Sequence, residues 1–311
     1  MVSGLYTQLL TLGNQWSVEP RLGLNYKIRK DQRLSVGYGL HSQMAPIEVY
    51  FEQVELADGS YVTPNKEIDF TKSHHLIAGY QKRFKHGIQL KMEAYGQYLT
   101  DVPVENKSST FSLQNFGATF ITATPDTLVN GGEGYNYGIE LTLEKYLDKG
   151  FYFLVTGSLF ESKYKGSDNI WRNTAFNSNH TLNVLGGYEF RFKSKKDDPK
   201  YKSALSVDLK FVWNGGGRYT EILLDQSEIL GEEVRDYDNA YVLTYADYLK
   251  GNLRIAYKLI GKKTTQEWAF DVQNFMNRDN IFYEEYNASA GSVRTVYQNG
   301  LLAIFQYRIS F

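Results

Sequence analysis

The chain has 311 residues, and 34 Lys and Arg against 35 Asp and Glu give a net charge of −1 at pH 7. This balance provides no long-range field that would attract nucleic acid, and the absence of any run of about 18 apolar residues excludes a helical membrane protein. Cysteine is absent, which excludes a disulfide framework and a thiolate metal site. Aromatic residues are unusually numerous, with 25 Tyr and 18 Phe. Such enrichment is typical of strands whose ends lie at a membrane–water interface.

Strict alternation of apolar and polar residues predicts β-strands along the whole chain. The clearest run extends from Trp16 to Ile28, which is longer than an average soluble strand and suits a tilted strand that spans a bilayer. About twelve antiparallel strands are predicted, at residues 3–11, 16–28, 34–40, 76–83, 88–94, 135–143, 151–164, 182–192, 205–213, 253–259, 268–274 and 300–311.

The polar face of these strands carries Glu, Lys and Arg, which a dry protein core would not tolerate. A water-filled lumen on this side and lipid on the other would suit both faces. The fold class is therefore predicted to be all-β, an antiparallel transmembrane β-barrel portion, with an aromatic-rich β-sandwich as the alternative. The residues predicted to face the lumen are Glu19, Arg21, Arg33, Lys91, Glu93, Glu140, Glu144, Asp208, Lys210 and Arg254.

The predicted connections alternate in length. Short turns are expected at residues 29–32, 85–87, 148–150 and 261–264, and long loops at about 44–72, 101–131, 164–179, 215–246 and 276–292. Short periplasmic turns and long extracellular loops are typical of bacterial outer-membrane barrels. The basic stretch from Lys193 to Lys202 is the one inner connection expected to be longer than a tight turn.

The last strand, from Gly300 to Phe311, places Phe305, Tyr307, Ile309 and Phe311 on one face and closes on an aromatic residue. Outer-membrane barrels end in this way. This strand and the strand at residues 3–11 differ in length, and we expect them not to pair with each other, so that the sheet stays open.

Aromatic residues in the long loops are the candidate ligand contacts, because aromatic rings beside amides and charges suit the capture of sugars, siderophores or peptides. Packing within the loops would explain the same residues equally well. The candidates are Tyr50, Tyr61, Phe116, Trp171, Tyr219 and Tyr283.

No metal, cofactor or catalytic site is predicted. His74 and His75 are adjacent on a strand, so their side chains should point to opposite faces and not chelate one ion. The acidic loop between Asp225 and Asp238 could attract Ca²⁺ but has no EF-hand spacing, which favours a solvated surface loop. No nucleophile triad, P-loop or dinucleotide fingerprint is present, so the chain is not expected to be an enzyme.

Several segments together resemble the C-terminal barrel of TonB-dependent outer-membrane receptors. They include Gly4-Leu-Tyr-Thr-Gln, Asn136-Tyr-Gly-Ile-Glu-Leu-Thr-Leu-Glu, Trp171-Arg-Asn-Thr-Ala-Phe-Asn, Gly215-Gly-Gly-Arg-Tyr-Thr and Trp268-Ala-Phe-Asp-Val-Gln-Asn. The similarity runs through nearly all of the chain, mainly on strands and their edges.

The resemblance implies a barrel of about 22 strands with a plugged lumen. Residues 1–311 would be part of that barrel, and we expect the plug, the signal peptide and the first strands to be missing. It also implies a Gram-negative outer-membrane location, lipid as solvent, insertion by the barrel-assembly machinery, and import of a bulky nutrient, such as a siderophore or glycan, driven by the TonB complex through the missing N-terminal region. A self-contained passive channel of about twelve strands and an adhesive or structural surface barrel are the alternatives.

Overall fold

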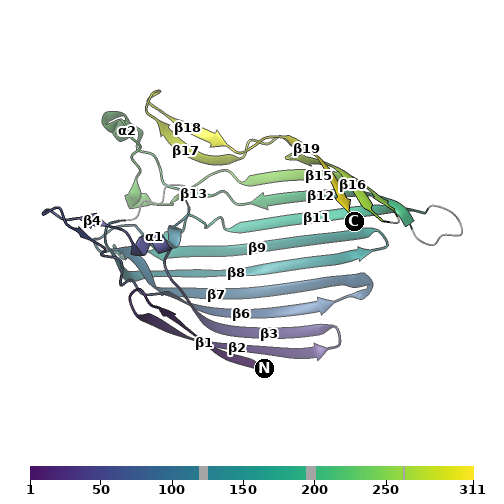
Figure 1. Ribbon diagram of the computed structural model, residues 1–311, viewed down its shortest axis with the longest axis horizontal. Coiled ribbons are helices and arrows are strands. Elements are labelled where there is room, and N and C mark those ends of the chain that lie inside the picture. The colour runs from purple at the N-terminus through teal and green to yellow at the C-terminus, as the bar shows by residue number, and fades with distance from the viewer. Residues whose placement is uncertain (119–124, 194–200, 262) are drawn as a thin grey trace.

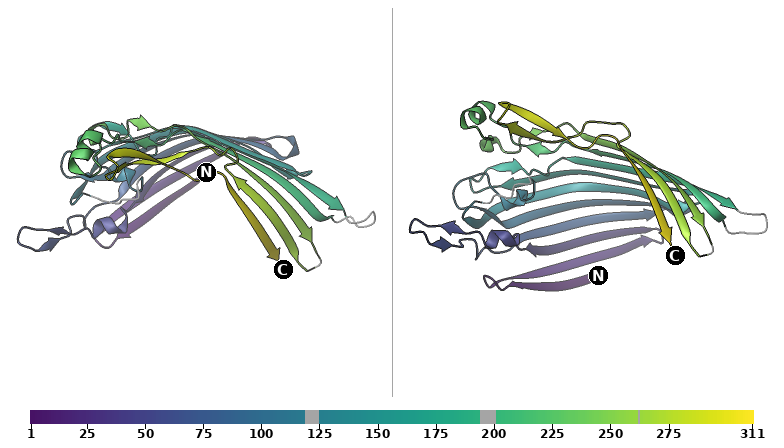
Figure 2. Two further views of the ribbon diagram at one scale, coloured as in Figure 1. Left: turned by 90° about the horizontal axis from the view of Figure 1, so that it is seen from above. Right: turned by 45° about the horizontal axis from the view of Figure 1, so that its top comes forward.

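A computed structural model describes residues 1–118, 125–193, 201–261 and 263–311. Its main feature is one strongly curved antiparallel sheet (Figures 1 and 2), in which each long strand pairs with the next long strand along the chain. The strands run in the order β1 (Val2–Leu10), β2 (Gln15–Arg29), β3 (Gln32–Gln43), β6 (Thr71–Arg83), β7 (Ile88–Glu105), β8 (Leu128–Asp148), β9 (Phe151–Lys165), β11 (His180–Lys193), β12 (Tyr201–Asn214), β15 (Tyr248–Ile260), β16 (Thr265–Gln273) and β19 (Leu302–Ser310). The predicted antiparallel sheet of about twelve strands is confirmed.

The five long loops predicted from the sequence lie at one end of the sheet, which we call the loop end, together with the short β1–β2 turn at residues 11–14. The other described short turns lie at the opposite end, the turn end (Figure 1). The loops contain short elements of their own, which are α1 (Ile47–Tyr50), β4 (Val54–Glu55), β5 (Tyr61–Val62), η2 (Leu113–Asn115), β10 (Trp171–Asn173), β13 (Arg218–Tyr219), α2 (Leu224–Leu230), η3 (Tyr237–Asn239), β14 (Leu243–Thr244), β17 (Ile281–Asn287) and β18 (Ser292–Tyr297). The predicted alternation of connection lengths is confirmed, while the basic connection predicted at 193–202 falls mainly on residues 194–200, outside the described ones.

The turns are short because their residues accept the backbone angles that tight hairpins require. Between β8 and β9, Lys149 and Gly150 both have positive φ, at 54° and 85°. Two consecutive residues with positive φ form the turn that matches the twist of the flanking strands. A Cβ at Gly150 would also lie 2.6 Å from the carbonyl oxygen of Glu189, so only glycine fits. Among the described residues, the turn end carries the short helix η1 (Lys85–Gly87).

Cross-strand register gathers the apolar residues of all twelve strands on one face. Leu34 lies opposite Tyr80, Tyr80 opposite Met92, and Met92 opposite Leu141. The same continuity holds at the other side of the sheet, where Ile255 lies opposite Phe270 and Phe270 opposite Phe305. Most of these side chains are exposed, so no layer formed by the described residues covers the apolar face.

Aromatic residues on this apolar face concentrate toward the two ends of the strands, and aliphatic residues lie between them. The loop-end belt contains Tyr38, Tyr98, Tyr135, Tyr137, Trp171 and Trp213, and the turn-end belt contains Tyr26, Phe151, Tyr188, Phe190, Tyr257, Trp268 and Tyr307. This is the distribution expected where a strand passes through two membrane–water interfaces.

The sheet is open. β1 pairs only with β2 within it, and β19 pairs only with β16, so these two strands form its edges. The prediction that the first and last strands do not pair with each other is confirmed. No helix in the described part of the chain has the length and apolarity that a membrane span would require.

Two strands extend much further toward the loop end than alternation predicts. β7 continues to Glu105 instead of 94, and β8 begins at Leu128 instead of 135. Their pairing passes through register shifts between Leu99 and Val104. A β-bulge inserts a residue and breaks the period of two while the strands stay paired, which hides this extension in the sequence.

Candidate functional site

The ten charged residues predicted to line a lumen all lie on one face of the sheet, opposite the apolar face, and we call it the charged face. Across the strands Arg33 lies opposite Gln81, Gln81 opposite Lys91, and Asp208 opposite Arg254. That this face encloses water stays a prediction. The set is Glu19, Arg21, Arg33, Lys91, Glu93, Glu140, Glu144, Asp208, Lys210 and Arg254.

Long side chains connect neighbouring strands along the charged face. Arg254 on β15 donates to Asp271 at 2.7 Å and to Glu267 at 3.0 Å, and it reaches Gln306 on β19 at 3.2 Å. Because these groups come from three strands, one guanidinium fixes their relative positions and keeps its charge paired.

Glu19 differs from the other charged residues because it is buried, with 1% of its surface exposed. Its carboxylate accepts from the side-chain amide of Gln8 at 2.8 Å, the backbone N–H of Ser42 at 3.1 Å and the guanidinium of Arg21 at 2.7 Å. Glu19 thus joins β1, β2 and β3 near the loop end and is covered from solvent, so its place on the charged face gives it a structural role.

The long loops form a packed body at the loop end, which we call the loop assembly and define as the described parts of residues 44–70, 106–127, 166–179, 215–247 and 274–301. Together with the adjoining strand ends it forms a hydrophobic cluster. Its buried residues are Ala45, Val49, Tyr50, Ile68 and, at the start of β8, Leu128, and Leu10, Leu12, Phe111 and Leu113 pack against them. The loops therefore have a core of their own.

Tyr50 belongs to this core, and its prediction as an exposed ligand contact is wrong. None of its surface is exposed, and its hydroxyl accepts a hydrogen bond from the backbone N–H of Ala45 at 3.1 Å. The ring is covered because it belongs to one buried cluster with Ile68 and Leu128, which come from distant segments.

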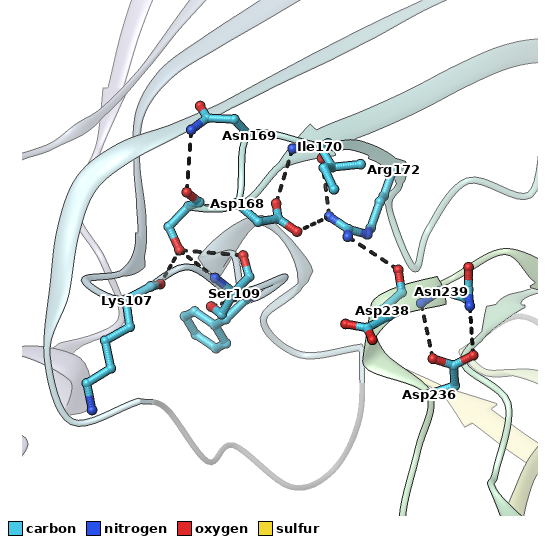
Figure 3. Close-up of polar contacts among 11 residues, drawn as sticks. Lys107, Ser109, Asp168, Asn169, Ile170, Arg172, Asp236, Asp238 and Asn239 are labelled. Carbon is cyan, nitrogen blue, oxygen red and sulfur yellow. Dashed lines mark hydrogen bonds and ion pairs between the residues drawn. The ribbon is translucent and has the colours of Figure 1, made fainter.

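A buried arginine joins two loops, and a serine near it adds a third (Figure 3). The Arg172 guanidinium pairs with the Asp168 carboxylate at 2.7 Å and donates to the backbone carbonyl of Asp238 at 3.3 Å, which links loop 166–179 to loop 215–247. The side chain of Arg172 is 8% exposed. In the same group, the hydroxyl of Ser167 donates to the carbonyl of Lys107 and accepts from the backbone N–H of Ser109, which adds loop 106–127.

Two further arginines make the same kind of contact. Arg218 donates to the carbonyl of Asn177 at 3.0 Å and to the carbonyl of Val242 at 3.3 Å. Arg235 donates to the carbonyl of Thr220 at 2.8 Å and to the carbonyl of Glu284 at 2.9 Å, which attaches loop 274–301. The three arginines therefore hold three loops in one arrangement.

Sequence reasoning did not single out these arginines, although a signal was present. Arg172 and Arg218 lie inside the segments Trp171-Arg-Asn and Gly215-Gly-Gly-Arg that carry the family resemblance. The aromatic residues beside them were predicted as ligand contacts instead. Adjacent strand residues point to opposite faces, so the arginine and its aromatic neighbour have different surroundings.

Trp171 illustrates this point. It pairs with Lys165 in register, and its ring lies 4.9 Å from the ring of Tyr135, on the apolar side of the sheet. Trp171 therefore belongs to the loop-end aromatic belt on the apolar face, away from the charged face. Tyr61, in contrast, is 61% exposed in the β4–β5 hairpin, where its hydroxyl donates to Glu55.

Tyr219 stacks on Tyr245 with ring centroids 4.0 Å apart and planes 3° from parallel. The hydroxyl of Tyr245 accepts from the backbone N–H of Glu284, and burial raises the pKa of Tyr245 to about 12. Phe116 is half-buried beside η2, and Tyr283 is half-buried with its ring 5.2 Å from that of Phe282. The six aromatic candidates thus occupy separate surroundings, and a ligand role for those other than Tyr50 stays a prediction.

The described residues contain no group of three or more His, Asp or Glu that could hold a metal ion. His74 contacts Tyr38 on the apolar face, and His75 lies beside His41 on the charged face, so the two neighbours do point apart. In the acidic loop, Glu233 pairs with Arg235 at 2.7 Å and Asp236 accepts from the backbone N–H of Asn239, so both carboxylates serve internal contacts.

Comparison with solved structures shows the same fold. The ferric yersiniabactin uptake receptor of Yersinia pestis aligns with a TM-score of 0.59 and 14% identity over 99% of this chain and 41% of its own. A mutant of the ferric enterobactin receptor of Pseudomonas aeruginosa aligns with a TM-score of 0.57 and 13% identity over 96% of this chain and 41% of its own. The ferripyoverdine receptor of the same bacterium, bound to ferripyoverdine, aligns with a TM-score of 0.58 and 15% identity over 94% of this chain and 32% of its own.

The chain thus spans less than half of these receptors. None of the curated proteins compared with it matches. A family model described as TonB dependent receptor-like, beta-barrel matches residues 6–275, which is most of the chain. Together with the two-faced sheet and its loop end, this match shows that the chain belongs to the β-barrel family of TonB-dependent receptors.

Proposed function

We propose that residues 1–311 form part of the barrel wall and the outer cap of a TonB-dependent receptor that imports a bulky nutrient across the Gram-negative outer membrane. The observation that carries the proposal is the division of one sheet into an apolar face with two aromatic belts and an opposite charged face, capped at one end by the loop assembly. Lipid would contact the apolar face, and the charged face would border the solute pathway.

The substrate class follows from the neighbours and from the loops. The three receptors named above are receptors of ferric yersiniabactin, ferric enterobactin and ferripyoverdine. In this chain, the exposed Tyr61 and the half-buried Tyr219 and Tyr283 would offer ring surface and hydroxyl groups to a large solute at the loop end. We therefore favour a ferric siderophore over a glycan.

The energy for import and the segment that gates the solute pathway would come from outside residues 1–311. A plug segment and the segment that engages the TonB complex would belong to a longer protein, of which this chain supplies the wall. Insertion would use the barrel-assembly machinery, which in this family begins at the last strand, here β19. The chain would bind no nucleic acid and catalyse no reaction.

Uptake by the complete receptor tests the proposal. The locus that encodes this chain, with any adjoining coding sequence in frame, would be expressed in a strain that lacks siderophore receptors. We expect accumulation of radioactive iron from a panel of ferric siderophores that stops when TonB is deleted. Accumulation that persists after TonB is deleted would contradict the proposal. So would a complete lack of accumulation of every siderophore and glycan tested.

The open sheet argues against the self-contained channel, because that alternative requires β1 and β19 to pair. Planar-bilayer measurements on the 311-residue chain separate the two, since a closed small barrel should give stable unitary conductance and an open sheet should not. An adhesive barrel would bind surfaces or matrix without solute flux.

A further inference from the structure

Five basic side chains gather at the turn end of β2, β3 and β6, and we call them the basic patch. They are Lys27, Arg29, Lys30, Arg33 and Arg83, and all five are exposed. Together with Asp31, Gln32 and Gln81 they line one shallow hollow. Asp31 is the one acidic residue among these eight, so the hollow has a strongly positive lining.

The sheet register forces two of these charges together. Lys27 lies directly opposite Arg33 on the neighbouring strand, and Arg33 lies opposite Gln81, which provides no charge. Like charges directly opposite each other destabilise an antiparallel pair. An anion at this position would remove that cost, so the register itself favours bound negative charge.

The patch also differs from two other parts of the charged face in lacking carboxylate partners. Elsewhere Arg21 pairs with Glu19 at 2.7 Å and Arg254 pairs with Asp271 at 2.7 Å. Among the residues that the structure describes, none of the five side chains of the basic patch forms an ion pair, and the guanidinium of Arg83 meets only the neutral amide of Gln89, at 3.3 Å. Their donors are available to a ligand.

We propose that the basic patch docks an acidic polypeptide segment, with several Asp or Glu side chains, that reaches the charged face from the turn end. The patch covers three adjacent strands, about 10 Å across, and it is shallow, which suits an extended chain with several carboxylates better than one enclosed ion. Arginine binds carboxylates through two parallel hydrogen bonds. This inference goes beyond nutrient import and does not depend on which solute is carried.

A phospholipid headgroup is the competing source of negative charge, and the faces of the strands disfavour it. Lys27 and Arg33 alternate with Tyr26 and Leu34, which lie on the apolar face that lipid would cover. The two cations therefore point away from the membrane side of the sheet.

The test uses the full 311-residue chain in detergent micelles and a fluorescent peptide of alternating Glu and Ser, with the Gln–Ser peptide as its neutral counterpart. Fluorescence anisotropy should show binding of the Glu–Ser peptide alone, weakening about tenfold as salt rises from low to several tenths molar. The double variant Lys27→Gln with Arg33→Gln should bind about tenfold more weakly.

The matched control is Lys210→Gln with Arg308→Gln, which removes the same two charges from the same face on β12 and β19 and should leave peptide affinity unchanged. Thermal unfolding separates docking from folding, because removing the opposed cations should raise stability. Three outcomes would each overturn the proposal. They are an equal loss of peptide affinity in both double variants, no binding of the acidic peptide, and binding of phosphatidylglycerol vesicles through the patch in place of the peptide.

Discussion

The sheet and the loop assembly differ in how their apolar side chains are kept from water. The sheet leaves Leu141, Ile255 and Phe305 exposed and needs an apolar solvent to cover them. The loop assembly buries Tyr50 and Val49 completely and satisfies its backbone carbonyls with arginine side chains, as a water-soluble domain does. The comparison teaches that only the loop assembly carries its own core, and the two regions should therefore respond differently to mutation.

Tyr50→Ala should have a large effect, confined to the loop assembly. Loss of a fully buried aromatic ring costs about 3–5 kcal/mol. We expect faster proteolysis of residues 44–70 and 106–118 in the folded chain, measured by mass spectrometry, with the sheet intact. Tyr61→Ala is the control, because that ring is 61% exposed and its loss should change stability by less than about 0.5 kcal/mol. Equal sensitivity of both variants would contradict a loop core.

Arg172→Ala tests whether one guanidinium holds the loops together. It would leave the carboxylate of Asp168 in a largely buried position without its cation, which costs about 3–5 kcal/mol when such a pair is broken. Hydrogen exchange should accelerate in residues 166–179 and 236–240. Arg294→Ala, which breaks an exposed pair with Glu285, should cost less than about 1 kcal/mol. Unchanged exchange in Arg172→Ala would show that the loops are held by other contacts.

Leu141→Arg and Val207→Arg test the apolar face. An arginine on the lipid side of a barrel costs about 2–4 kcal/mol near the bilayer midplane. Denaturant titration in lipid vesicles should show this loss, whereas Glu140→Arg, one residue away on the charged face, should be tolerated because Glu93 lies opposite it. If both apolar-face variants behave like wild type, the two faces have been assigned the wrong way round.

Tyr245→Phe should give the smallest effect. It removes the acceptor of the Glu284 N–H, which costs about 1 kcal/mol at any pH, and it also changes the response to alkali. Burial raises the pKa of Tyr245 from 10 to about 12, so its neutral form is stabilised in the folded loops. That stability is fully present below about pH 10 and is lost as the pH rises through about 12, by about 1 kcal/mol midway. The variant should lack this alkaline loss. Tyr237→Phe, at an exposed position, serves as the control, and an identical alkaline profile for Tyr245→Phe and wild type would contradict the assignment.

The sheet could be predicted from the sequence because its rule is local. Parity along a strand decides the face, so Glu140 and Leu141 separate without knowledge of their neighbours. Prediction failed where the surroundings of a residue depend on distant parts of the chain or where a bulge breaks the alternation. Tyr50 looked exposed because its burial depends on Leu128, which is distant in the chain, and the extension of β7 to Glu105 was hidden by bulges. Arg172 was missed because its partners, Asp168 and the carbonyl of Asp238, come together only in the folded loops.

The arginine contacts between the loops have an evolutionary consequence. Arg172, Arg218 and Arg235 grip the carbonyl oxygens of Asp238, Val242 and Glu284, and every residue type supplies a backbone carbonyl. The side chains at the accepting positions are therefore free to drift without loosening the scaffold. Three retained arginines would be enough to let the exposed surface of these loops change in sequence while the frame beneath them stays the same.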